Sequence, residues 1–117
     1  MRSMLRVTKQ AKENAKEALE ERKELSESEK YGLSKSEAKD EGVRSGVERA
    51  KQIIRKSYYD WKDSEDRKSL ISMARFYSRF QNCRSKKCEG AMKLWGGRWW
   101  LRNEVVPFVN EKGGYNY

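Results

Sequence analysis

Apolar side chains recur every three or four residues through the middle of the chain, and this spacing constrains the fold more than any other feature. The clearest stripe follows a helical period at Val43, Val47, Ala50, Ile54, Tyr58 and Trp61. The residues that β-hairpin turns require are scarce, and the chain contains a single proline, Pro107. The sequence therefore predicts an all-α fold, a small helical bundle of three to four helices with a long charged N-terminal helix.

The apolar residues also predict how the chain is divided. Only 36% of the 117 residues are hydrophobic, so the core must be small. We expect it within residues 34–109, preceded by a charged N-terminal helix or arm at 1–33 and followed by a flexible C-terminal tail at 110–117.

The N-terminal segment has a thin apolar stripe. Its positions are Met4, Val7, Ala11, Ala18 and Leu25. Because alanine buries little surface, this stripe cannot support a strong coiled coil. The segment is interpreted either as a solvated arm or as a helix that docks on a partner, and it is the predicted site of any homo-oligomer contact.

Two helix starts are marked by side chains that can bond to free backbone amides. Ser34 precedes Glu37 by three residues, which is the spacing of a capping box, and it predicts the start of the helix that carries the first stripe. Asp63 or Ser64 is the predicted cap of the next helix. That helix has its own apolar stripe at Leu70, Met73, Ala74, Tyr77, Phe80 and Cys83.

The C-terminal third contains two helix-breaking signals. Gly96 and Gly97 either end a helix or let another backbone pass close to a continuing one, and we favour a bend. A short final helix is expected to stop before Pro107, because a residue that precedes proline is pushed out of helical space. Phe108 is expected to anchor the chain just beyond that stop.

The positive charge of the protein is concentrated in residues 67–102. This stretch holds ten basic side chains and one acidic side chain, Glu89, so its net charge equals the +9 of the whole chain. Attraction to a polyanion explains such a field better than solubility does, because solubility needs less charge. On a helix, Lys68, Arg75 and Arg79 fall within about 40° of one another and form a cationic ridge.

Aromatic residues are interleaved with these cations, and most of them fit the apolar stripes of the core. Trp99 and Trp100 are the exception, because adjacent helical residues point about 100° apart. One of the two rings is expected to stay exposed beside Arg98 and Arg102, where it can stack on a base. The candidate nucleic-acid-binding residues are Lys68, Arg75, Arg79, Arg84, Lys86, Lys87, Lys93, Arg98, Trp100 and Arg102.

The residue types that carry most catalysis and metal binding are missing or isolated. The chain has no histidine, which removes the commonest general base and metal ligand. We therefore expect no enzymatic activity, no metal site and no cofactor. Cys83 and Cys88 would point about 140° apart on a continuous helix, and they can pair only if residues 84–87 form a turn. We expect them to be free thiols in a reducing compartment.

Nothing in the sequence indicates a membrane or secretory segment. No apolar run is long enough to cross a bilayer, and the N-terminus lacks the apolar stretch of a secretory signal. The sequence predicts an intracellular, cytoplasmic protein without a membrane partner. Its composition, rich in Glu and Lys, is also compatible with a thermophilic or viral origin.

Three functions agree with these features. The first is a small non-enzymatic protein that binds the phosphate backbone of DNA or RNA largely without sequence specificity. A helix-turn-helix reader of base edges fits poorly, because the link between the helices is long and charged and the second helix carries tryptophan and glycine. The second function is an inhibitor or adaptor that docks on the acidic surface of a protein partner. The third is a self-assembling structural or packaging protein. We favour the first.

Overall fold

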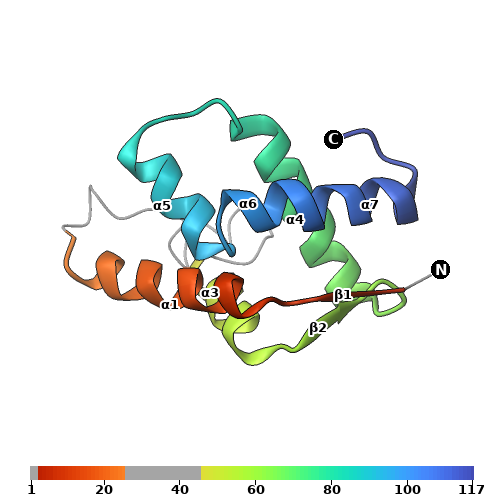
Figure 1. Ribbon diagram of the computed structural model, residues 1–117, viewed down its shortest axis with the longest axis horizontal. Coiled ribbons are helices and arrows are strands. Elements are labelled where there is room, and N and C mark those ends of the chain that lie inside the picture. The colour runs from red at the N-terminus through yellow and green to blue at the C-terminus, as the bar shows by residue number, and fades with distance from the viewer. Residues whose placement is uncertain (1–2, 26–45) are drawn as a thin grey trace.

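A computed structural model of the protein describes residues 3–25 and 46–117. Helices make up most of the described residues, and a two-stranded sheet joins them (Figure 1). The elements in chain order are β1 (Met4–Arg6), α1 (Lys9–Lys23), α3 (Gly46–Arg55), β2 (Tyr58–Asp60), α4 (Ser64–Phe80), α5 (Lys86–Leu94), α6 (Arg98–Trp100), the π-helical segment η1 (Leu101–Val105) and α7 (Val106–Gly113). The prediction of a mostly helical fold is confirmed, whereas the sheet was not predicted.

The sheet pairs two strands that lie far apart in the sequence. β1 runs antiparallel to β2, with Leu5 opposite Tyr59. Both of these side chains are fully buried, whereas Met4 and Tyr58 beside them are exposed. The apolar stripes predicted helices through β1 and through Tyr58, and both predictions are wrong. Three residues are too few for a two-residue period to be distinguished from a helical stripe.

The helix α1 lies within the segment 1–33 that the sequence analysis gives as a charged N-terminal helix or arm, and it packs into the core. It begins after Thr8, whose side-chain oxygen accepts a hydrogen bond from the backbone N–H of Ala11 at 3.1 Å. Ala11, Ala15 and Ala18 are fully buried, and the helix contacts α3 and α5. Small side chains let helix axes approach closely, so an alanine face that buries little area still forms a tight contact.

The helix α3 carries the clearest stripe but ends earlier than predicted. Ala50 and Ile53 are fully buried, and the helix stops at Arg55. The chain then enters β2, and Trp61 lies in the turn that follows this strand instead of in the helix. The proposed capping box at residues 34–37 lies outside the described residues.

The helix α4 starts as predicted, after Asp63. The side chain of Asp63 accepts hydrogen bonds from the backbone N–H groups of Glu65 at 2.9 Å and Asp66 at 3.0 Å. One face of the helix is buried through Leu70, Met73, Ala74 and Tyr77. The helix ends at Phe80, which is exposed, so Phe80 and Cys83 do not extend the buried stripe as predicted.

The chain bends at Gly96 and Gly97, as the sequence analysis favoured. The helix α5 ends at Leu94, and α6 begins at Arg98. The two glycines have φ angles of +99° and +94°, a region that residues with a side chain rarely adopt. The side-chain amide of Asn14 in α1 donates a hydrogen bond to the carbonyl oxygen of Gly96 at 3.0 Å, so the bend is docked on α1.

The last helix continues through Pro107, and the prediction that it stops there is wrong. In η1, the backbone N–H of Val106 donates to the carbonyl oxygen of Leu101, five residues earlier. Pro107 lies in the first turn of α7. Proline lacks a backbone N–H, but a helix does not need a hydrogen bond from the N–H groups of its first turn. Phe108 therefore lies within α7 and is buried there, instead of anchoring the chain beyond a helix end.

The residues predicted as a flexible tail are held by defined contacts. α7 continues to Gly113, and Gly114 ends it in the left-handed conformation. The side-chain amide of Asn110 donates to the carbonyl oxygen of Tyr117 at 3.3 Å and accepts from its backbone N–H at 3.0 Å. The end of the described chain therefore folds back on α7.

Candidate nucleic-acid interface

The predicted cations do not form one patch. One group is the ridge on α4, where Lys68, Arg75 and Arg79 are all exposed. At about 100° per residue, these three side chains lie on the opposite side of α4 from Leu70 and Tyr77, which face the core. The ridge that the sequence predicts is therefore on the outer surface.

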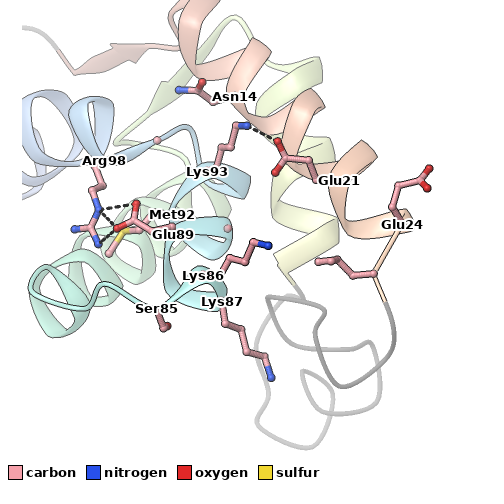
Figure 2. Close-up of a pocket in the computed structure, with 13 residues that line it drawn as sticks. Asn14, Glu21, Glu24, Ser85, Lys86, Lys87, Glu89, Met92, Lys93 and Arg98 are labelled. Carbon is pink, nitrogen blue, oxygen red and sulfur yellow. Dashed lines mark hydrogen bonds and ion pairs between the residues drawn. The ribbon is translucent and has the colours of Figure 1, made fainter.

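Lys93 is already neutralised by carboxylates of α1. Its ammonium nitrogen lies 2.6 Å from a carboxylate oxygen of Glu21 and 3.0 Å from one of Glu17 (Figure 2 draws the pair with Glu21). The hydrogen bond to Glu21 is the main reason why the pKa of Lys93 is raised above its ordinary value. We therefore correct the prediction and remove Lys93 from the candidate interface, because its charge serves to join α5 to α1.

Arg98 is also committed to structural contacts. Its guanidinium donates to Glu89, with Nη2 at 2.7 Å from Oε1, and Figure 2 shows the two side chains facing each other. It also donates to the backbone carbonyl oxygens of Gln81, at 2.7 Å, and Cys83. The hydrogen bonding between the two side chains lowers the pKa of Glu89 and raises that of Arg98. Arg98 therefore ties the loop after α4 to α5 and α6, and little of its charge is left for a phosphate.

Cys83 and Cys88 form a disulfide, so the prediction of free thiols is wrong. The residues between them form a link and a new helix start instead of a continuous helix. Ser85 caps α5 by accepting a hydrogen bond from the backbone N–H of Cys88 at 3.1 Å. Because residues 84–87 do not continue the helix, the two sulfur atoms come close enough to bond, whereas a straight helix would hold them apart.

A basic groove lies between the C-terminal end of α4, the disulfide loop and the helix formed by α6 and η1. Its volume is about 800 Å³. Its cations are Arg84, Arg98 and Arg102, its acidic residue is Glu89, which pairs with Arg98, and its side-chain amides are Gln81, Asn82 and Asn103. Arg84 and Arg102 are exposed, and no ion pair to either is found among residues 3–25 and 46–117. Arg84 donates from Nη1 to the backbone carbonyl oxygens of Gln81 at 3.2 Å and Cys83 at 3.3 Å. The amides were not predicted, since nothing in their spacing indicates a shared site.

The two adjacent tryptophans have opposite environments, as predicted, but the exposed ring is Trp99. Trp99 is 66% exposed and lines the groove, whereas Trp100 is 2% exposed. Trp100 packs near Tyr59 of the sheet, with ring centroids 6.5 Å apart. Trp100 was named as a nucleic-acid contact, and this assignment is wrong because its ring belongs to the core.

Lys86 and Lys87 lie at a second hollow, of about 980 Å³, between α1 and α5. In Figure 2 their side chains extend away from the pair of Arg98 and Glu89. The same hollow is lined by Glu21 and Glu24, so its charge is mixed. It is a weaker candidate for a polyanion than the groove is.

Other kinds of site find no support in the described residues. No group of His, Cys, Asp or Glu side chains in this part of the chain is arranged to hold a metal ion. No helix among the described residues is long and apolar enough to span a bilayer. Comparison with protein-family models, with curated proteins and with solved structures found no match.

Proposed function

We propose that the chain is a small non-enzymatic nucleic-acid-binding protein that contacts the phosphate backbone largely without sequence specificity. The observation that carries this proposal is the exposed ring of Trp99 in a groove that also holds Arg84 and Arg102. Within this proposal, the fold is a small helical bundle whose charged N-terminal helix supports the bend at Gly96.

The proposal agrees with the balance of charge. Two of the predicted cations, Lys93 and Arg98, are paired with carboxylates, but the chain still has a net charge of +9. Arginine guanidinium groups suit phosphates, because their planar N–H donors match two phosphate oxygens at once. The ridge of Lys68, Arg75 and Arg79 adds long-range attraction from another side of α4.

An acidic protein surface is the competing partner, because carboxylates are also bound by arginine. The two partners differ in how binding depends on salt. Binding to nucleic acid releases condensed counterions, so the logarithm of the affinity falls linearly with the logarithm of salt concentration. Self-assembly would instead appear as growth in particle size without any added partner.

The test is a mobility-shift titration with single- and double-stranded DNA and RNA at about 50 and 200 mM salt. We expect binding at the lower salt and a steep loss at the higher salt. The double variant Arg84→Glu, Arg102→Glu should weaken binding by more than about tenfold, because two phosphate contacts become repulsive.

The matched control is Arg75→Glu, Arg79→Glu, which changes the net charge by the same amount on the ridge. It should weaken binding less, because only the long-range field changes. Equal losses in both double variants would show that the groove is not the interface. Absence of binding to every nucleic acid at low salt would reject the proposed function and favour the acidic protein partner.

A further inference from the structure

Trp99 is the most exposed large hydrophobic side chain among the described residues, at 66%. Leaving an indole in water forgoes the stabilisation that burial of its large apolar surface would give. The residues that follow it, Trp100 and Leu101, are buried, so the outward direction of Trp99 is fixed by the packing of its neighbours.

The backbone that carries Trp99 is held in place from both sides. On its N-terminal side, the guanidinium of Arg98 bonds to Glu89 and to the carbonyl oxygen of Gln81. On its C-terminal side, the side-chain amide of Asn103 donates to the carbonyl oxygen of Trp99 at 2.9 Å. A ring on an anchored backbone loses less conformational freedom when it binds a ligand than a ring on a mobile loop does.

The surroundings of Trp99 suit a nucleotide better than a purely apolar ligand. Arg102 follows it by three residues and lines the same groove. Arg84 reaches the groove from the disulfide loop, and the carboxamide of Asn82 also lines it. The groove therefore offers a flat aromatic face, two cations and a side chain that can bond to the edge of a base.

We infer that the groove binds single-stranded nucleic acid, with one base stacked on Trp99 and the neighbouring phosphates on Arg84 and Arg102. This inference rests on the proposed function and adds the strandedness of the ligand. In a duplex, the faces of each base are covered by its neighbours in the stack, so an indole can reach a base face only in an unpaired strand. Every base has a π face, so stacking of this kind gives little sequence preference.

The experiment uses the full chain and fluorescence anisotropy at low salt. The probes are a short thymidine oligonucleotide, the same oligonucleotide with abasic sites throughout, its RNA counterpart and a duplex. We expect the abasic strand to bind about 5- to 100-fold more weakly than the thymidine strand, because it keeps the phosphates and loses the bases. The duplex should also bind more weakly than the single strand, and the RNA strand should bind like its DNA counterpart.

Two variants assign the effect to the ring. Trp99→Ala should bind the thymidine and abasic strands equally, whereas Trp99→Phe should keep most of the difference. Circular dichroism should show that both variants fold, since the ring is exposed. If the wild-type chain binds the abasic strand or the duplex as tightly as the thymidine strand, base stacking is wrong while the proposed function stands. If it binds none of the probes, the proposed function itself fails.

Discussion

At the scale of single residues, Asp66 joins the start of α4 to β2 and to Lys56, which precedes that strand. It lies in the first turn of α4, and its Oδ2 accepts a hydrogen bond from the backbone N–H of Asp60 in β2 at 3.0 Å. Its Oδ1 pairs with the ammonium of Lys56 at 3.0 Å. The residue is only 6% exposed, so water competes little with these two partners for its carboxylate.

We expect Asp66→Ala to lower the free energy of unfolding by about 2–4 kcal/mol, because it leaves a backbone donor and a lysine without their shared acceptor. Asp66→Asn should lose less, since its carbonyl oxygen can still accept from Asp60. Urea denaturation measures both. The control is Glu13→Ala, which removes an exposed carboxylate from α1 and should change stability by less than about 0.5 kcal/mol. A similar small effect for Asp66→Ala would contradict the role assigned to it.

At the scale of elements, the loop between α4 and α5 forms one wall of the groove, and two kinds of interaction hold it in place. The disulfide of Cys83 and Cys88 closes it within the chain. The guanidinium of Arg98 fastens it to α6 through the carbonyl oxygens of Gln81 and Cys83. The wall that carries Arg84 therefore depends on a covalent bond and on a charged clamp.

Replacing both cysteines with serine should lower the free energy of unfolding by about 2 kcal/mol, the chain-entropy contribution of so short a loop. Adding reductant to the wild-type chain should have the same effect. The double-serine variant serves as the control, because its stability should not respond to reductant. Chemical denaturation with and without reductant makes this comparison. A wild-type chain that is equally stable in both conditions would show that the clamp alone holds the loop.

The elements that the sequence predicted well are those with several turns or a strong local signal. α4 has four buried apolar positions at helical spacing and an aspartate cap, and the bend follows from two adjacent glycines. The errors have local causes. Each strand has three residues, and its partner lies far away in the sequence. The path through Pro107 depends on the π turn before it, which no residue pattern marks.

The candidate site was predicted only in part, for a similar reason. The exposure of Lys68, Arg75 and Arg79 follows from helical periodicity, because it is a property of one element. The pairing of Lys93 with Glu17 and Glu21 depends on how α1 docks against α5, which the sequence does not reveal. The choice between Trp99 and Trp100 likewise depends on which side of α6 the rest of the core covers.

At the scale of the whole molecule, ion pairs join parts of the chain that the net positive charge would otherwise push apart. Lys93 joins α5 to α1, and Glu89 joins α5 to Arg98 at the start of α6. Because the pKa of Lys93 is raised in the folded protein, its ion pairs stabilise the fold fully at a pH below the ordinary pKa of lysine. This stabilisation is lost as pH rises through the raised pKa. The pKa of Glu89 is lowered, so the pair of Glu89 with Arg98 stabilises the fold at a pH above the ordinary pKa of glutamate. This stabilisation is lost as pH falls through the lowered pKa.

The acid side of this balance can be tested with Glu89→Gln. At neutral pH the variant should be less stable than the wild-type chain, because the charged acceptor of Arg98 is gone. The difference should begin to shrink as pH falls below the ordinary pKa of 4.5, where the carboxyl of the unfolded chain takes up a proton, and it should be lost once pH falls below the lowered pKa of the folded chain. The effect should be small, because the Glu89 side chain is 47% exposed and water screens the pair. Thermal unfolding at a series of pH values measures it. The stability difference between Glu89→Gln and the wild type could instead stay constant down to acid pH. That result would mean that Arg98 is held by the backbone carbonyl oxygens of Gln81 and Cys83 and not by the charge of Glu89.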